Sequence, residues 1–166
     1  MGMSVIISAA EAEDAEQILK LQYLGYQPEA ELYGDWAIGP LTQSLESLRA
    51  ELSEQHVLVA RLGDEVVGTV RGRVGEDGVA RIGSLVVHPR MQRHGLGGRL
   101  LDALERRMAQ DGPVRAYRLS TGHRSLGNLR LYARQGYRQT GVEQVNSRLS
   151  FVHLEKPAAA PLAATA

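Results

Sequence analysis

The first third of the chain combines two helical patterns with one short extended segment. Acidic residues followed by apolar positions three and four apart predict a helix over Glu11–Gln22, after a strand over Val5–Ser8. Leucines at positions 41, 45, 48 and 52 mark the buried stripe of a second helix. Residues 23–40, between the helices, are rich in Tyr, Gly and Pro, and we expect them to be irregular.

Tight turns then separate three extended segments. His56–Arg61, Glu65–Val74 and Val79–Val87 are rich in β-branched residues and joined by short Gly-containing turns. This spacing predicts an antiparallel meander.

Helices and strands alternate in the remainder of the chain. Apolar periodicity predicts a helix from near Gly95 to Asp111 and another over Ser125–Gln135. Strands are predicted over Arg115–Ser120, Tyr137–Gln144 and Ser147–Glu155. The order of elements indicates an α/β domain with a mixed sheet.

Composition narrows the classes of protein. The 166 residues, 43% of them hydrophobic, suit a single globular domain over residues 1–156, followed by a disordered tail over 157–166. The absence of cysteine excludes a disulfide framework, an iron–sulfur site and a thiol nucleophile. No apolar run is long enough to span a bilayer and no secretory signal is evident, so we expect a cytoplasmic protein that does not bind membranes.

The zero net charge hides an asymmetry along the chain. Residues 1–56 hold ten acids and two bases, whereas residues 90–138 hold eleven arginines and three acids. One interpretation is that surface helices simply differ in charge, and the other is that the arginine-rich part holds an anion. Nucleic acid is not expected as a partner, because no aromatic stacking motif accompanies the arginines.

A glycine-rich segment at residues 92–98 joins a strand to a helix. Glycines allow close approach of a ligand, and the first N–H groups of the helix point outward, so the segment suits a phosphate. Arg90, Arg93 and Arg99 add positive charge. The alternative is a tight connection in which glycine only relieves strain. A dinucleotide fingerprint fails because position 100 is Leu, and a P-loop fails because no lysine follows the glycines.

Two motifs in this part of the chain resemble those of a known superfamily. Gln92–Gly97 reads Q-x-x-G-x-G and resembles the acetyl-CoA-binding motif of the GNAT superfamily of N-acetyltransferases. Asn128–Tyr137 is similar to the N-x-x-x-Y-x-x-x-G-[FY] segment of the same family. The resemblance implies a GNAT-like α/β (α+β) fold, with a mixed, mostly antiparallel central sheet of about seven strands flanked by about four helices.

The resemblance also implies acetyl-CoA as cosubstrate and a set of residues that bind it. Backbone groups of the preceding strand would hold the pantetheine arm, at Leu85, Val86 and Val87. Main-chain amides would bind the pyrophosphate, at Gln92, Arg93, His94, Gly95, Leu96, Gly97 and Gly98. Asn128 would form a hydrogen bond with the cofactor from the following helix.

Tyr132 and His123 are the candidate catalytic residues. Tyr132 matches the family position that faces the cofactor sulfur, where a phenol protonates the leaving thiolate; the alternative is a ring that only packs under the loop. Many members of the family carry a glutamate that acts as general base on the strand before the loop, but residues 81–84 contain no carboxylate. His123 is therefore the candidate base, against the alternative of a solvent-exposed loop histidine. The histidines show no metal-ligand spacing, so no metal is expected.

Residues 23–40 are the candidate acceptor loop, with Tyr26, Tyr33 and Trp36 as candidate substrate contacts. The alternative is a hydrophobic cover over the two helices. Our hypothesis is an N-acetyltransferase that moves the acetyl group of acetyl-CoA directly to a primary amine in a ternary complex. The missing glutamate favours an alternative, a catalytically weak acyl-CoA-binding sensor. An RNA-binding protein ranks below both, and the resemblance is compatible with a homodimer.

Overall fold

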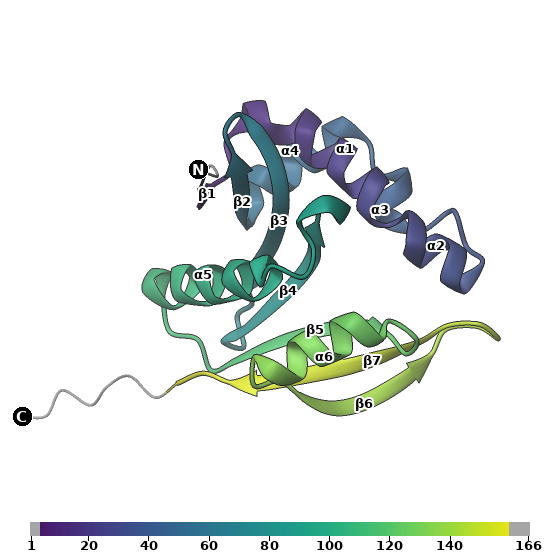
Figure 1. The fold of residues 1–166 in the computed structure, drawn as a ribbon. Helices are drawn as coiled ribbons and strands as arrows, with labels where there is room; N and C mark the ends of the chain where they lie inside the picture. Colours follow the sequence, from purple (N-terminus) through teal and green to yellow (C-terminus); the bar gives the residue numbers. More distant parts are fainter. Residues whose placement is uncertain (1–3, 160–166) are drawn as a thin grey trace, which may run out of the picture.

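The computed structural model describes residues 4–159, which form one seven-stranded sheet with helices on its faces (Figure 1). The strands are β1 Val5–Ala9, β2 His56–Leu62, β3 Glu65–Val74, β4 Val79–Val87, β5 Ala116–Gly122, β6 Arg138–Gln144 and β7 Ser150–Pro157. Their order in the sheet is β1-β2-β3-β4-β5-β7-β6, and every neighbouring pair is antiparallel except β4–β5. The predicted mixed, mostly antiparallel sheet of seven strands is confirmed.

Helices cover both faces of this sheet. They are α1 Ala15–Gly25, α2 Gln27–Tyr33, α3 Gly39–Thr42, α4 Leu45–Glu54, α5 Leu96–Asp111 and α6 Leu126–Arg134, with short 3₁₀ turns η1 Ala12–Asp14 and η2 Pro89–Met91. In Figure 1, α1, α3 and α4 lie toward the upper right of the sheet, whereas α5 lies to the left of β4 and α6 lies along β5 and β7. The helical layers thus sandwich the strand that ends at the glycine-rich loop.

Two hydrophobic clusters fill the two faces. The larger one packs the apolar stripe of α5, with Leu100, Leu101 and Leu104 fully buried, against the central strands and α6. The smaller one packs Ile18 of α1 and Leu48 of α4 against the opposite face of β2–β4. Burial of these side chains fixes β4 between the clusters, because β4 contributes residues to both.

Two predictions about the N-terminal helices are wrong. Residues 23–40 are not irregular, since they contain α2 and the start of α3. The second predicted helix is also divided, because Gln43 has an extended ψ of 133° and α4 starts only at Leu45. The Ser44 hydroxyl accepts a hydrogen bond from Ser47 N–H at 3.1 Å, and this N-cap competes with a continuous helix from Leu41.

The ends of the domain also differ from expectation. The first long helix starts at Ala15, four residues later than predicted, after the 3₁₀ turn η1. At the other end, β7 reaches Pro157, and Ala158 N–H donates to the Arg115 carbonyl at 3.1 Å, so the expected tail begins later than residue 157. Residues 160–166 of that tail lie outside the described residues.

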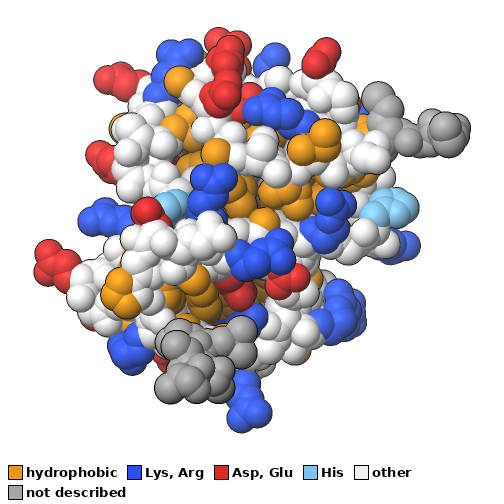
Figure 2. Space-filling view, turned by 90° about the vertical axis from the view of Figure 1, so that its left-hand side faces the viewer, with side chains coloured by type: hydrophobic (Ala, Val, Ile, Leu, Met, Phe, Trp, Pro, Cys, Tyr) orange, Lys and Arg blue, Asp and Glu red, His pale blue; other side chains and the backbone are white. Residues whose placement is uncertain are grey.

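The charge asymmetry of the sequence becomes a division of the surface. On the face shown in Figure 2, acidic side chains gather mainly at the top, where Figure 1 places the N-terminal helices, and Lys and Arg side chains lie mainly across the middle and lower parts. Over residues 4–159, no helix combines the length and apolarity that a membrane crossing requires.

Candidate active site

The sheet opens between its two parallel strands. β4 and β5 are paired only where Val79–Arg81 face Ala116–Arg118, at the start of each strand. Beyond these residues the described parts of both strands continue without further pairing, and Figure 1 shows them diverging. The result is a wedge-shaped opening whose two edges carry unpaired strand backbone, which a ligand can use.

A β-bulge in β4 accompanies this opening. The β3–β4 register shifts between Thr69 and Arg71, so that Ser84 and Leu85 together face a single residue of β3. Ser84 has a φ of 53°, an uncommon value for a residue with a side chain. A bulge bends and twists its strand, which gives a physical cause for the departure of β4 from β5.

The loop after β4 forms the predicted start of α5. Arg93 and Gly95 have φ values of 71° and 75°, and Gly95 is the N-cap residue of α5 without any side-chain cap bond. Because glycine has no side chain, the N-cap residue provides no acceptor for the first amide N–H groups of α5. The helix dipole adds partial positive charge at these amides. A Cβ at Gly95 would meet no atom within 4 Å, so the space in front of the loop is open.

The next two glycines serve helix packing. A Cβ at Gly97 would lie 3.0 Å from Leu131 Cδ2, and one at Gly98 would lie 2.7 Å from Gln135 Nε2. Both partners belong to the α6 region, so these glycines let α5 and α6 approach each other closely. Leu96 is buried in the main cluster and is available to a ligand only through its backbone.

Side chains of the loop differ in how they are held. Gln92 Nε2 donates to the Val87 carbonyl at 3.2 Å and ties the loop to the end of β4. Arg90 pairs with Glu65 at 3.1 Å, and Arg99 donates to the Val5 carbonyl at 3.2 Å. Arg93 and His94 are exposed and form no hydrogen bond or ion pair through their side chains within residues 4–159. Arg93 is thus the loop arginine that remains available to an anion.

Tyr132 of α6 is buried, yet its hydroxyl has no partner. Its ring packs on Tyr137, with centroids 6.1 Å apart, and only 6% of the residue is exposed. Every fully buried side-chain N or O atom within the described residues has a hydrogen-bond partner, so the unpaired Tyr132 hydroxyl must reach accessible space. Burial, with a smaller contribution from Tyr26 and Glu29, raises its pKa above the usual value, and the phenol stays protonated at neutral pH.

Tyr26 connects the N-terminal helices to the bulge. Its hydroxyl donates to the Leu85 carbonyl at 3.3 Å, and burial raises its pKa to about 12. Tyr26 therefore contacts the bulge of β4 and holds this part of the strand in position. Its predicted contact with an acceptor stays a prediction.

Tyr33 has a different place from the one predicted. Tyr33 is 6% exposed, and its hydroxyl connects α2 to the segment after β5. The Arg124 N–H donates to this hydroxyl at 3.0 Å, and the hydroxyl donates to Ser125 Oγ at 2.7 Å. Ser125 in turn donates to Glu29 Oε2 at 2.6 Å. We call this the Arg124–Glu29 chain. It locks α2 onto the β5–α6 connection, and the prediction that Tyr33 contacts an acceptor finds no support in this geometry.

The remaining predicted site residues differ in their exposure and in their hydrogen bonds. Asn128, in the first turn of α6, donates to Thr121 Oγ1 at 3.3 Å and is half-buried. Trp36 is 59% exposed beyond the end of α2. His123 is exposed, and its Nδ1 lies 3.0 Å from the Ser150 amide nitrogen and 3.2 Å from the Ser150 carbonyl oxygen. The Ser150 backbone therefore occupies this nitrogen in either tautomer.

A hollow of about 510 Å³ lies on the face of β4 that carries α4. Arg71 is buried there, where its guanidinium binds Gln22 Oε1 at 2.8 Å and Glu51 Oε2 at 2.9 Å, and burial lowers its pKa. Gly83 and Ser84 of the bulge also line the hollow. The hollow therefore borders the bulged part of β4 and is a candidate place for an acceptor.

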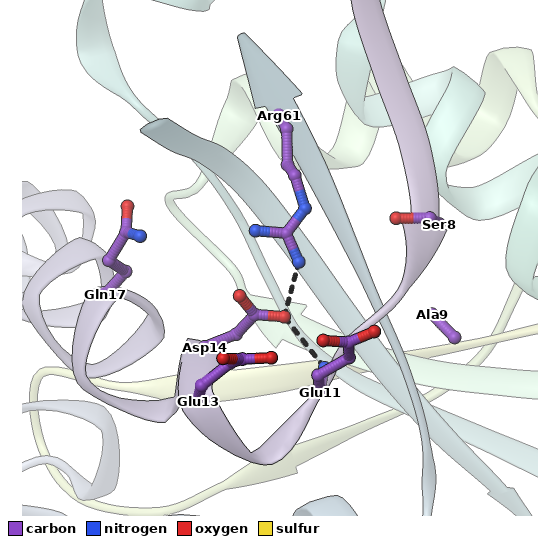
Figure 3. A pocket seen from close by; sticks show the side chains of 7 residues that line it. All are labelled: Ser8, Ala9, Glu11, Glu13, Asp14, Gln17 and Arg61. Carbon is purple, nitrogen blue, oxygen red and sulfur yellow. Dashed lines mark hydrogen bonds and ion pairs between the residues drawn. The ribbon is translucent and has the colours of Figure 1, made fainter. Parts of the chain in front are cut away.

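A larger hollow, of about 660 Å³, lies away from the opening (Figure 3). Asp14 is nearly buried in it, accepts a hydrogen bond from Glu11 N–H at 2.7 Å and pairs with Arg61 of β2. Burial raises the pKa of Asp14, but the hydrogen bonds from Arg61 and Glu11 outweigh it and hold the pKa below its usual value. These contacts join η1 to the sheet, so the cluster has a structural role.

Sequence reasoning missed three polar residues that meet across β5, β7 and β6. The Ser120 hydroxyl lies 2.6 Å from His153 Nδ1, and His153 Nε2 lies 3.1 Å from Glu143 Oε1. The three residues belong to no common motif, and only the strand register brings them together. An alternation of polar positions along the three predicted strands was the sole signal in the sequence, and it does not specify which residues face each other.

Comparison with known families agrees with this geometry. The model of the acetyltransferase (GNAT) family matches residues 15–137, which is more than half of the chain. The chain belongs to this family, and the predicted acetyl-CoA-dependent acetyltransferase is confirmed at the level of the family. No curated protein sequence matches the chain.

Solved structures show the same fold. The acetyltransferase of the GNAT family from Streptococcus pneumoniae is 18% identical with a TM-score of 0.78, over 94% of this chain and 100% of that one. The PaiA N-acetyltransferase from Thermoplasma acidophilum, in complex with coenzyme A, is 18% identical with a TM-score of 0.77, over 93% and 99%. The Salmonella typhimurium protein yncA, with its cofactor acetyl-CoA, is 20% identical with a TM-score of 0.74, over 96% and 99%.

Proposed function

We propose that this acetyltransferase transfers the acetyl group of acetyl-CoA directly to a primary amine, within a ternary complex. The proposal rests on the N-terminus of α5, where Gly95 provides no side-chain cap, beside the opening between β4 and β5. Two similar folds contain this class of ligand: the PaiA structure holds coenzyme A and the yncA structure holds acetyl-CoA.

The cofactor assignment follows from charge and backbone geometry. A pyrophosphate needs several donors that no side chain obstructs, and the amides of residues 92–98 together with the helix dipole supply them. Arg93 adds a free positive charge. The pantetheine arm then runs along the unpaired edge of β4 at Leu85–Val87, with Asn128 on the opposite wall.

The chemistry needs a donor at the leaving sulfur and a neutral amine at the carbonyl. The Tyr132 hydroxyl is protonated, unpaired and open to accessible space, so it suits the first task. Attack by the amine on the thioester carbonyl gives a tetrahedral intermediate whose nitrogen carries an extra proton. Its collapse releases the thiolate, which takes the Tyr132 proton, while the extra proton on nitrogen passes to water and Tyr132 regains a proton from water. The chain has no cysteine, so no acyl-cysteine intermediate is involved.

One observation favours a second candidate, an acyl-CoA-binding sensor without turnover. The strand before the loop lacks the glutamate that would act as a general base. Position 83 is a glycine, and β4 carries no carboxylate between Arg81 and Val87. Without another base, the ammonium form of the acceptor would persist and transfer would be slow. Steady release of CoA in the presence of amines separates the two functions.

The test of the phosphate site is Gly95→Asp, with Gly78→Asp as matched control. Both glycines have nearly equal φ values, 75° and 79°, so the backbone strain of the substitution is similar, but Gly78 lies in the β3–β4 turn. We expect Gly95→Asp to weaken acetyl-CoA binding in calorimetry by on the order of 100-fold or more, because a carboxylate would meet the phosphates. Unchanged affinity in Gly95→Asp would refute the assignment.

A further inference from the structure

The hydrogen-bonded chain Ser120–His153–Glu143 lies beside the opening and has no role in the steps above. Building on the acetyl transfer proposed for this site, we propose that these three side chains form a proton relay that deprotonates the acceptor amine. Glu143 and His153 lie beyond residue 137, where the match to the family model ends.

The strand register places Ser120 at the edge of the opening. Arg81 and Arg118 form the last pair between β4 and β5. Two residues further along each strand, Gly83 and Ser120 stand across the opening from each other. A Cβ at Gly83 would meet no atom within 4 Å, so the space beside Gly83 on the β4 side is open.

Ser120 also lies on the face from which an acceptor can approach. Side chains alternate along a strand, and Leu119 points into the cluster that contains α5. Ser120 therefore points to the opposite face. That face carries the hollow of about 510 Å³ lined by Gly83 and Ser84. The cofactor loop belongs to α5, so donor and acceptor reach the opening from opposite faces.

The hydrogen bonds of His153 favour one tautomer of its neutral ring. Glu143 is a carboxylate and can only accept, so the 3.1 Å contact favours the proton on His153 Nε2. Nδ1 then carries the lone pair and accepts the Ser120 hydroxyl proton at 2.6 Å. In His123, by contrast, the Ser150 backbone occupies Nδ1.

The relay removes the proton of the acceptor in two coupled proton transfers. The ammonium of the acceptor donates an N–H proton to Ser120 Oγ while the Ser120 O–H proton moves to His153 Nδ1. Serine stays neutral, the amine becomes a nucleophile, and His153 becomes an imidazolium stabilised by Glu143. The His153 side chain is 34% exposed, so it returns the proton to water before the next turnover.

Other charged groups lie near His153. Arg118 of β5 pairs with Glu155 of β7 at 3.4 Å, two residues along the strands, and Arg138 of β6 faces Glu155. His123 lies at the opposite end of β7, bonded to Ser150. Glu143 is thus the carboxylate in direct contact with the His153 ring, and the relay has a defined partner on each nitrogen.

The test measures kcat/KM against pH for His153→Asn, with lysine, a peptide with a free α-amino group and a diamine as acceptors. We expect kcat to fall about 100-fold, the usual contribution of a general base, with unchanged affinity for CoA. We expect kcat/KM of the wild type to fall at acidic pH, because a protonated His153 cannot accept a proton, and in His153→Asn only the ionisation of the amine should remain. Glu143→Gln should shift that loss to lower pH, because the imidazolium loses a stabilising charge.

Two controls make the result specific. His56→Asn removes another surface histidine–carboxylate pair, His56 with Asp111 at 3.2 Å, and should leave the profile unchanged. Imidazole added to His153→Ala should restore activity in proportion to its unprotonated form, which a structural defect would not allow. A wild-type profile for His153→Asn would overturn the relay alone. Wild-type protein that binds acetyl-CoA but acetylates no amine would overturn both the relay and the proposed function.

Discussion

Gly122 lies directly beneath Tyr33, so closely that a Cβ at position 122 would overlap the tyrosine hydroxyl. The same hydroxyl accepts from Arg124 N–H and donates to Ser125, which places α2 at a fixed position over the end of β5. The glycine is required here because of a neighbour's position rather than its own backbone conformation. The wall of the opening therefore depends on a contact between residues far apart in the sequence.

Gly122→Ala tests this contact. The added methyl group must displace Tyr33, and we expect a loss of about 2 kcal/mol in the free energy of unfolding, a usual cost of overpacking. Thermal denaturation should show it as a decrease in Tm of roughly 5 °C. Gly127→Ala in α6 is the control, because its Cβ meets no atom within 4 Å and alanine favours a helix. Equal stability of Gly122→Ala and the wild type would contradict the packing described here.

Tyr132→Phe separates chemistry from stability. The Tyr132 hydroxyl has no hydrogen-bond partner among the described residues, so its removal should change Tm little while kcat falls about 100-fold. The affinity for acetyl-CoA should persist. Because burial raises the Tyr132 pKa, the phenol keeps its proton on the alkaline side, and no loss of kcat below about pH 10 should arise from its ionisation.

The matched control for that variant is Tyr137→Phe. The Tyr137 hydroxyl donates to Glu105 Oε2 at 2.8 Å inside the main cluster, and Lys156 Nζ binds the other oxygen at 2.8 Å. We expect this variant to lose stability by about 1–3 kcal/mol, since it leaves a buried carboxylate with one donor fewer. If Tyr132→Phe instead lost stability and kept full kcat, its role as a proton donor would be refuted.

Asp14→Asn tests the pH dependence of stability. Asp14 has a lowered pKa in the folded state because of Arg61 and Glu11, so its ionised form favours folding above the ordinary carboxyl pKa of about 3.9. This contribution is lost as the pH falls through the lowered folded-state value. At pH 7 we expect the variant to be less stable than the wild type by about 2 kcal/mol, and the difference should shrink below about pH 4.

Urea denaturation at several pH values measures this difference. Asp102→Asn in α5 is the control, because Asp102 is exposed and forms no ion pair within residues 4–159. A difference that stays constant from pH 7 to pH 3 would show that the Asp14 carboxylate does not act through its charge.

The sheet and the cofactor loop could be predicted from sequence because their signals are local. The strand pattern around Val79–Val87 and the glycines after Gln92 both depend on residues close in the chain, and the structure has both where predicted. The helix boundaries failed where one polar side chain decides the outcome. Ser44 caps α4 and divides a leucine stripe that otherwise reads as one continuous helix.

The acceptor side could not be predicted because it depends on pairing between distant strands. Ser120 and His153 are separated by 33 residues and meet only through the β5–β7 register. Tyr33 shows a related difficulty. An aromatic residue in a polar, glycine-containing segment resembles a ligand contact, and the sequence does not show that the Ser125 hydroxyl and the Arg124 amide occupy its hydroxyl.

The Arg124–Glu29 chain has a consequence for any attempt to change which molecules this enzyme accepts. It joins the first helices to the strand and helix that carry Ser120 and Tyr132, so the two walls of the opening form one mechanical unit. Exchanging residues 27–36 for the corresponding segment of another enzyme would break that joint and displace the residues proposed to react at the same time. Selectivity and rate are therefore coupled in this architecture, and a successful redesign has to transplant both ends of the joint together.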